Sequence, residues 1–300
     1  MFADTLPYWI LVLIVLGLFL VSQAAGVHRE MFENGDGQPT VIYEDEEIYD
    51  DFYASIYDIL FSTPERISFE KASLHELALS ERPVTETKVL DVCCGTAPHA
   101  QWMCEEGVEY VGLDTSEAML NRARKRCASA RFYKGSATDL NAFPPKAFSH
   151  AMLLYFSAYQ FRNPKLLFDT LYQWIKPGGM LVVHMVDPHK FDPILDAASP
   201  FPAFSLQKYS TDRVIQSDVV FDKFHYKSRF IKDNDEEVAI FEEIIQKNGE
   251  EEIRENKHKL YMPPVSHMLD MIRAAGFSKQ EMVDMTPAGY EYQWLVYFTK

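Results

Sequence analysis

The sequence predicts an α/β fold with a mostly parallel sheet, and three observations support this. Between Lys88 and Arg126, short apolar runs alternate with helix-like segments in the order strand, turn, helix, strand. The two-residue alternation typical of antiparallel strands occurs farther along, between residues 218 and 262. The chain has 300 residues, of which 47% are hydrophobic. That length suits one domain of about 250 residues with an appendage.

The first apolar run ends in Asp91 and is followed by the small-residue turn Cys93-Cys94-Gly95-Thr96. Pro98 opens the expected helix, and the next apolar run ends in Asp114. This is the arrangement of a nucleotide-type site at the carboxyl edge of a parallel sheet. Small turn residues let a ligand approach the backbone, and an acid about 20 residues on can accept hydrogen bonds from ribose hydroxyls.

The turn after Asp91 does not fit the sequence pattern of a dinucleotide-binding loop. In the G-x-G-x-x-G pattern the glycine positions are taken by Cys93, Gly95 and Pro98. Pro98 lacks an N–H and places a ring where the third glycine allows close helix packing. The phosphate-loop lysine pattern is also missing from the sequence. A zwitterionic ligand that carries a ribose fits better.

The whole stretch resembles class I S-adenosylmethionine-dependent methyltransferases. Their first motif, V-L-D-x-G-x-G-T-G, is VLDVCCGTA here, with Cys93 and Ala97 replacing two glycines. The resemblance covers residues 85–187 and 264–300. It implies a seven-stranded, mostly parallel sheet with helices on both faces, and S-adenosylmethionine as cofactor. Later motifs follow in order: YVGLDTSEAML, FYKGSATDL, FSHAMLLYFSAYQF, LYQWIKPGGMLVVHM, and AAGFSKQEMVDM with QWLVYFTK.

The resemblance also implies roles for individual residues. Asp114 would bind the ribose and Met119 would lie near the adenine. Ser136 stands where an acid often contacts the adenine amine, with Asp139 three residues later. A tyrosine-rich helix, residues 49–61, would close over the cofactor or substrate. The residues expected to bind the cofactor are Asp91, Cys93, Gly95, Thr96, Asp114, Thr115, Met119, Ser136, Ala137, Leu153 and Tyr57.

Methyl transfer needs an in-line nucleophile in a dry pocket, and a base only if that nucleophile must lose a proton. Side chains near the expected strand ends are the catalytic candidates: Tyr155, Tyr159, His184, Asp187 and His189. His184 could equally be a core histidine. The spacing of the last three is unspecific for metal ligation, so no metal site is predicted.

Residues 188–263 are too long for an ordinary connection and form an insert after the fifth strand. Their alternation predicts a three-stranded antiparallel meander. Turns are expected at residues 233–235 and at Lys247-Asn248-Gly249. The resemblance implies a cap over the substrate pocket. A stabilising flap or a protein-contact surface is the alternative.

Residues 5–27 carry no charge, and Leu6 to Val21 is almost wholly apolar. A helix of about 20 such residues can span a bilayer. The sequence therefore predicts a single-pass membrane anchor over residues 1–27, an acidic linker over 28–47 and a methyltransferase domain over 48–300. Arg29 follows the apolar run, which favours a cytosolic catalytic domain. A signal peptide cleaved after Ser22-Gln23-Ala24 and a buried helix are the alternatives.

The formal net charge of −15 argues against an exposed nucleic-acid backbone as partner. The four cysteines fit neither a zinc site nor a disulfide framework, which suits reduced thiols. Together these features predict a membrane-tethered methyltransferase acting on a small molecule, including lipophilic ones. A protein methyltransferase and a non-catalytic subunit of a membrane assembly remain alternatives. The sequence leaves the oligomeric state open.

Overall fold

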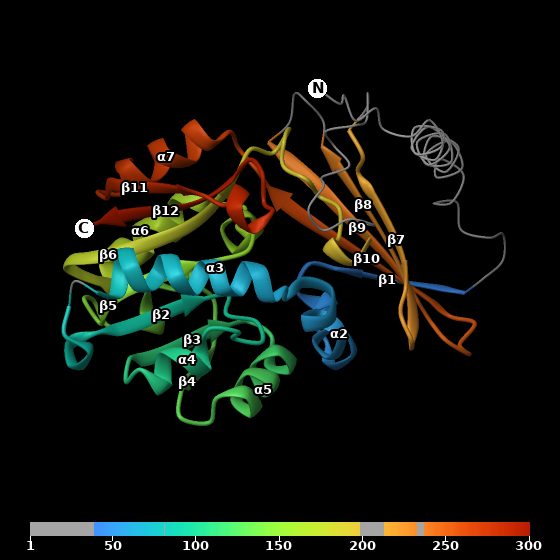
Figure 1. The fold of residues 1–300 in the computed structure, drawn as a ribbon, viewed down its shortest axis with the longest axis horizontal. Coiled ribbons are helices and arrows are strands. Elements are labelled where there is room, and N and C mark those ends of the chain that lie inside the picture. Colours follow the sequence, from blue (N-terminus) through green and yellow to red (C-terminus); the bar gives the residue numbers. More distant parts are fainter. Residues whose placement is uncertain (1–38, 81, 199–212, 233–236) are drawn as a thin grey trace, which may run out of the picture.

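The computed structural model describes residues 39–80, 82–198, 213–232 and 237–300, which form two sheets (Figure 1). The larger sheet has seven strands in the order β11-β12-β6-β5-β2-β3-β4. Strands β2 to β6 run parallel, while β12 is antiparallel to both of its neighbours. The predicted mostly parallel sheet is confirmed. Its strands are β2 (Lys88–Val92), β3 (Glu109–Asp114), β4 (Arg131–Lys134), β5 (Phe148–Leu153), β6 (Ile175–Val186), β11 (Ser278–Asp284) and β12 (Gln293–Thr299).

Helices cover both faces of this sheet, as expected. One apolar cluster joins the sheet to α6 (Pro164–Trp174) and α7 (Val265–Ala274). A second joins it to α3 (Pro64–Leu74), α4 (Ala100–Glu105) and α5 (Glu117–Arg126). All six residues of β5 are buried, which is the pattern of a central strand covered on both sides.

Local sequence signals fix the helix that follows β3. Ser116 is its N-cap, and its hydroxyl accepts a hydrogen bond from the Met119 N–H at 3.1 Å. Arg124, Lys125 and Arg126 occupy the last turn, where positive charge favours the helix dipole. This confirms the helix expected after Thr115 or Ser116. The preceding helix, α4, begins at Ala100, two residues later than Pro98 suggests.

The smaller sheet, called the cap sheet below, has the order β1-β10-β9-β8-β7. Three of its strands are the expected antiparallel meander: β8 (Phe224–Lys232), β9 (Val238–Lys247) and β10 (Ile253–Tyr261). Gly249, at a φ of +83°, lies in the expected turn between β9 and β10. The turn expected at 233–235 lies outside the described residues.

Two strands of the cap sheet differ from the sequence interpretation. The first expected strand is split, because a turn at residues 221–223 separates β7 (Gln216–Val220) from β8. In addition, β1 (Thr40–Glu44) lies within the segment interpreted as an acidic linker, and pairs in parallel with β10. Part of that segment is therefore a strand of the cap sheet.

Helix α2 (Asp51–Phe61) lies between the two sheets (Figure 1). Asp50 caps it by accepting from the Tyr53 N–H at 2.8 Å. Arg254 on β10, 7% exposed, donates to the other oxygen of Asp50 at 2.6 Å and to the Ile48 carbonyl at 2.7 Å. The tyrosine-rich helix is thereby fastened to the cap sheet at its first turn.

The sequence-based localisation needs correction. Among the described residues, none of the helices has the length and apolar character needed to cross a bilayer. The segment expected to form the anchor, residues 1–27, lies outside the described residues. The predicted transmembrane helix and single-pass membrane localisation are therefore not retained.

Candidate active site

The loop between β2 and α4 follows an unusual backbone path. Cys93, Gly95 and Ala97 all have left-handed φ angles, of 56°, 54° and 53°. Cys93 and Ala97 thus adopt the conformation that glycine favours, at a cost of about 1–2 kcal/mol each. Three residues of this loop thus lie in the left-handed region, and two of them are not glycine.

Asp114, at the end of β3, faces this loop. One of its carboxylate oxygens accepts from the Gly95 N–H at 2.8 Å, and the other from the Ser116 N–H at 2.9 Å. Burial raises the pKa of Asp114, and these N–H groups offset part of the rise. Each carboxylate oxygen can accept a further hydrogen bond.

Asp91 lies deeper, at the end of β2, and is 4% exposed. The Tyr110 hydroxyl donates to one of its oxygens. Burial raises the pKa of Asp91 to about 7, and the Tyr110 hydrogen bond limits the rise. Its ionisation is therefore poised near neutral pH and would respond to a cation placed above it.

The loop is tied to α2 and α5 by polar contacts. The Thr96 hydroxyl donates to Asp58 on α2 at 2.6 Å, and Arg126 pairs with the same carboxylate at 2.5 Å. The Ser116 hydroxyl donates to the Tyr49 carbonyl at 2.6 Å. The structure thus brings Asp91, Cys93, Gly95, Thr96, Asp114 and Tyr57 together around one loop.

The other expected cofactor residues line the edge next to this loop. Thr115 follows Asp114 directly, and Met119 is buried in the first turn of α5. The Ser136 hydroxyl contacts that of Thr138 at 2.8 Å. Ala137 and Leu153 are buried, at 2% and 0% exposure. Ser136 follows β4 and Leu153 ends β5, so both lie at the carboxyl edge.

Beside the loop is an open aromatic pocket, whose space together with the adjoining solvent is about 870 Å³. The walls come from four regions: the α2 region, the turn after β5, the segment 191–196 after β6, and the cap sheet, with Tyr290 and Gln293 completing the lining. Tyr57 on α2 connects the pocket to the loop, because its ring edge lies 4.0 Å from where a Cβ on Gly95 would be. The principal aromatic walls are Tyr49, Tyr53, Tyr57, Phe61, Tyr155, Phe156, Phe191, Phe230 and Phe241.

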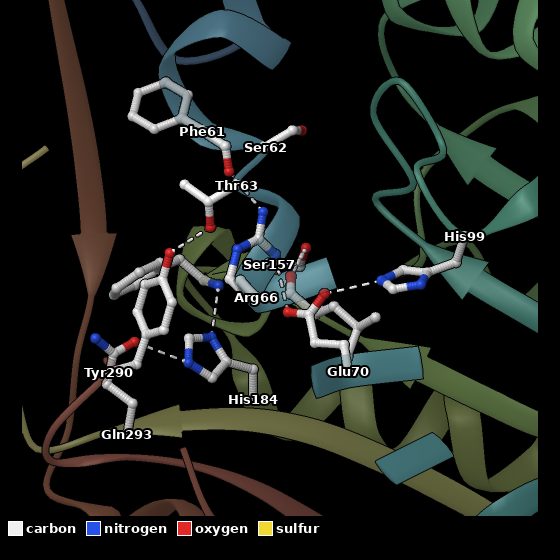
Figure 2. Close-up of polar contacts among 12 residues, drawn as sticks. Phe61, Ser62, Thr63, Arg66, Glu70, His99, Ser157, His184, Tyr290 and Gln293 are labelled. Atoms are coloured by element: carbon white, nitrogen blue, oxygen red, sulfur yellow. Dashed lines mark hydrogen bonds and ion pairs between the residues drawn. The ribbon is translucent and has the colours of Figure 1, made fainter. Parts of the chain in front are cut away.

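His184, a catalytic candidate from the sequence, has both ring nitrogens occupied (Figure 2). Its Nδ1 accepts from the Phe156 N–H at 3.2 Å, so Nε2 carries the proton and donates to Gln293 at 3.0 Å. Burial lowers the pKa of His184 to about 4. The geometry favours a positioning role, in which His184 holds Tyr155 and Phe156 at left-handed φ angles of 41° and 63°.

Of the remaining catalytic candidates, one lines the pocket and the others make contacts within the fold. Tyr155 lines the pocket, with the Arg66 guanidinium 4.0 Å from its ring centre. Tyr159 is fully buried, and its hydroxyl accepts from the Val186 N–H at 2.8 Å. Asp187 accepts from the His189 N–H at 3.0 Å, and neither of these two residues lines the pocket. Of the sequence candidates, Tyr155 alone faces the pocket.

A buried charged cluster was missed from the sequence; it contains Arg66, Glu70 and His99 (Figure 2). Arg66 donates to Glu70 at 2.8 Å and to the Phe61 carbonyl at 2.6 Å. Trp102 donates to His99 Nδ1 at 3.0 Å, so His99 Nε2 carries the proton and donates to Glu70 at 2.8 Å. Burial alone would raise the pKa of Glu70, but Arg66 and His99 lower it to about 2.

A second missed cluster lies in the cap sheet around Glu243, which is 0% exposed. One oxygen accepts from the Tyr53 and Tyr226 hydroxyls at 2.9 and 2.7 Å. The other accepts from Asn256 at 3.0 Å and His258 at 2.6 Å. Burial raises the pKa of Glu243, but His258 and the other donors outweigh it and hold it below its usual value.

One sequence signal could have revealed this cluster. Arg254, Asn256 and His258 are spaced two apart on a strand, so they share one face. Polar residues on the buried face of a strand require partners, which here include Glu243 and Asp50. In the part of the chain that the structure describes, no group of His, Cys, Asp and Glu is arranged to hold a metal.

Residues 89–179 match a family model described as a methyltransferase domain. The chain therefore carries a methyltransferase domain in this range. This family uses S-adenosylmethionine as cofactor, as the resemblance implied. The strand order of the larger sheet and the loop at the end of β2 agree with that assignment.

Two curated relatives illustrate the similarity. One is the Streptomyces venezuelae dTDP-3-amino-3,4,6-trideoxy-alpha-D-glucopyranose N,N-dimethyltransferase, 27% identical over 140 residues, covering 45% of this chain and 58% of that protein. The other is the Clavibacter sepedonicus demethylmenaquinone methyltransferase, 32% identical over 104 residues, covering 34% and 42%. The chain thus spans about half the length of the curated relatives it matches.

Solved structures share the fold across most of the chain. The CcbJ methyltransferase from Streptomyces caelestis superposes with a TM-score of 0.61 at 18% identity, covering 84% of this chain and 97% of that one. An amino pentose methyltransferase from Micromonospora echinaspora, with S-adenosylmethionine bound, gives 0.56 at 19% identity, covering 85% and 99%. At these identities the likeness shows the fold alone.

Proposed function

We propose that this protein transfers a methyl group from S-adenosylmethionine to a small-molecule acceptor held in the aromatic pocket. The observation that carries this is the shared wall between loop and pocket, where Tyr57 lies against Gly95. A cofactor on the loop would point its sulfonium end toward the acceptor across that wall.

The proposed cofactor contacts follow from the loop's geometry. Asp114 would accept hydrogen bonds from the ribose hydroxyls, and the backbone of Cys93 and Gly95 would hold the methionine part, with Asp91 below it. The residues proposed around the rest of the cofactor are Thr96, Thr115, Met119, Ser136, Ala137, Leu153 and Tyr57.

The chemistry asks mainly for position and exclusion of water, because the cofactor supplies an already activated methyl group. The ring of Phe61 lies between those of Tyr57 and Tyr155, with ring centres 5.2 and 5.9 Å away, at the side of the pocket formed by α2 and the turn after β5. Aromatic faces attract a cation such as a sulfonium. They also leave little room for water at the transfer step.

We further propose that the acceptor is an amine. Among the described residues that line the pocket there is no Lys or Arg, whereas Asp192 and Asp196 contribute carboxylates. Aromatic faces and carboxylates together favour a cationic acceptor over an anionic one. The name of the Streptomyces venezuelae relative, an N,N-dimethyltransferase of an amino sugar, supports an amine as well.

Three residues favour the alternative of a non-catalytic subunit: Cys93 and Ala97 in place of loop glycines, and Ser136 in place of an acid. The left-handed conformations of Cys93 and Ala97 weaken the argument from the loop, because the backbone still follows a glycine-like path. A loop of this form can accept a cofactor without either glycine.

The test follows a labelled methyl group from S-adenosylmethionine into three acceptors: 2-phenylethylamine, 1,4-naphthohydroquinone and benzoate. The proposal predicts label in the amine. Label only in the hydroquinone would keep methyl transfer but overturn the amine assignment. Lack of S-adenosylhomocysteine binding by calorimetry, or lack of label in all three acceptors, would contradict the proposed function.

A further inference from the structure

A line of polar groups crosses the wall of the aromatic pocket and ends at a buried carboxylate. The Gln160 amide donates to the Tyr49 hydroxyl at 3.1 Å. That hydroxyl lies 3.5 Å from His258 Nδ1, and His258 Nε2 lies 2.6 Å from Glu243. Gln160, Tyr49 and His258 line the pocket, while Glu243 is fully buried behind them.

The hydrogen-bond directions along this line are determined by its two ends. Glu243 is an acceptor, so His258 Nε2 donates to it, and in the neutral ring Nδ1 then carries the lone pair toward the pocket. At the other end, Gln160 donates to the Tyr49 oxygen, which leaves the Tyr49 proton free to point at His258 Nδ1. Every proton in the line therefore points from the pocket toward the carboxylate.

The surroundings keep Glu243 able to stabilise a charged His258. Its four hydrogen-bond donors hold the carboxylate ionised, and Tyr53 and Tyr226 are two of them. Tyr53 also lies 3.4 Å from His258 Nε2, but its hydroxyl donates to Glu243. A buried carboxylate that orients an imidazole, with the second nitrogen facing a substrate site, is the arrangement of a general base.

Other ionisable groups around His258 are paired with each other. Arg254, on the same strand, is bound to Asp50 at 2.6 Å. Lys257 is bound to Glu255 at 3.0 Å. The ring of Phe241 on β9 lies 5.6 Å from the imidazole and is apolar. The charge that faces His258 directly is thus the carboxylate of Glu243.

We propose that Tyr49, His258 and Glu243 form a proton relay that receives the proton lost by the methyl acceptor. This rests on the proposed function. An ammonium acceptor gives one proton to the Tyr49 oxygen as the Tyr49 proton moves to His258 Nδ1. The freed nitrogen lone pair then bonds to the methyl carbon, and the sulfur keeps the electrons of the broken S–C bond. The products are a methylated ammonium, S-adenosylhomocysteine and an imidazolium beside Glu243, which later releases its proton to solvent.

The test compares His258→Gln and Tyr49→Phe with a matched control, His225→Gln. His225 is also on the cap sheet and also pairs with a carboxylate, Asp218 at 2.5 Å, but it does not line the pocket. Each protein is assayed with 2-phenylethylamine from pH 5.5 to 9, alongside S-adenosylhomocysteine affinity and melting temperature.

His258→Gln should lower kcat about 100-fold and flatten the acidic limb of the pH–rate profile. Tyr49→Phe should lower kcat as well. Both should keep cofactor affinity within about threefold, because neither variant removes a group that we assign to the cofactor. His225→Gln should match the wild type throughout. A His258→Gln protein with wild-type kcat and pH profile would overturn the relay while leaving the proposed function standing.

A readout independent of turnover covers variants that fail to fold. Nitrogen-15 spectra of histidine-labelled wild-type protein should show the His258 proton on Nε2, the nitrogen that faces Glu243. A neutral His258 with its proton on Nδ1 would overturn the relay, because Nδ1 could not then accept the Tyr49 proton. If the wild-type protein binds no S-adenosylhomocysteine, the proposed function fails first and the relay with it.

Discussion

The proposed contact between the loop and the cofactor can be tested by adding one methyl group at Gly95. The site has a φ of +54°, and a Cβ there meets Tyr57 only at 4.0 Å, which is ordinary contact. Gly95→Ala should therefore fold, at a cost of about 1–2 kcal/mol from the left-handed backbone. The methyl should obstruct the cofactor and weaken S-adenosylhomocysteine binding at least tenfold by calorimetry.

Gly249→Ala is the matched control for this change. Gly249 has a φ of +83°, with no atom near the Cβ position, and it lies in the turn of the cap sheet. It should lose similar stability and keep its cofactor affinity. Equal affinities in the two variants would mean that the loop does not contact the cofactor.

Asp114 should determine much of the cofactor affinity. Asp114→Asn replaces one acceptor oxygen by an amide, so one charge-assisted hydrogen bond to the ribose is lost, worth about 1.5–3 kcal/mol. We expect at least tenfold weaker S-adenosylhomocysteine binding. Asp284→Asn is the control. Asp284 likewise accepts a hydrogen bond from a backbone N–H, that of Thr286 at 2.8 Å, but it lies on the edge strand β11, far from the loop in the strand order. Unchanged affinity in a folded Asp114→Asn protein would remove the ribose assignment.

Asp91 should make cofactor binding depend on pH. Its pKa of about 7 in the free protein means that it gains most of its charge between about pH 6 and pH 8. The cofactor's ammonium would favour the ionised form, so affinity should rise with pH across this range and level off above it. In Asp91→Asn the rise should disappear. A wild-type affinity independent of pH would show that Asp91 does not face the ammonium.

At the scale of elements, Glu70 joins α3 to the start of α4 through Arg66 and His99. Glu70→Gln leaves the Arg66 charge buried without its partner, which should destabilise the protein by about 3–5 kcal/mol. Because the folded-state pKa of Glu70 is lowered from 4.5 to about 2, its contribution is complete above pH 4.5 and is lost as the pH falls toward 2.

Denaturant unfolding at pH 7 and pH 3 measures how much Glu70 contributes to the free energy of unfolding at each pH. The difference in stability between wild type and Glu70→Gln should shrink at the lower pH. Glu117→Gln removes an exposed pair with Arg124, whose partners are 48% and 41% exposed, and should change stability by less than about 1 kcal/mol. A Glu70 effect as small as that of Glu117 would refute the structural role of the buried cluster.

The elements differ in how well the sequence predicted them. Strands of the larger sheet are continuous apolar runs with turn residues at their ends, so β2, β3 and their helices could be placed from sequence. β1 could not, because TVIYE is short, lies in an acidic stretch and is paired with a strand some 210 residues later. Its structure depends on β10 as a partner, which local composition does not encode.

The parts of the candidate site that belong to sequence motifs could be predicted, and the parts that do not could not. Asp91, Gly95 and Asp114 follow one another along the chain in a recognisable order, and the structure gathers them at one loop. His258 and Glu243 meet across two strands, and neither has a local signature. His184 shows the reverse case: its position at the end of a strand suggested chemistry, but the fold uses both of its nitrogens.

At the scale of the molecule, helix α2 lies between the larger sheet and the cap sheet (Figure 1). The larger sheet carries the loop, and the pocket beside it is lined by His258 and Phe241 of the cap sheet and by Tyr53 and Tyr57 of α2. This division suits a transfer reaction, because cofactor and acceptor can bind to different sheets and still meet. Hydrogen bonds join α2 to the cap sheet, through Asp50 and Arg254, and to the loop, through Asp58 and Thr96. These contacts keep the two halves of the candidate site aligned.

A crystal structure with S-adenosylhomocysteine bound tests this arrangement most directly. The ribose hydroxyls should lie within hydrogen-bond distance of Asp114, and the homocysteine part should lie on the backbone of Cys93 and Gly95. The sulfur should face the pocket between Tyr57 and Tyr155. Ligand density away from this loop, or a sulfur directed away from the pocket, would contradict the account.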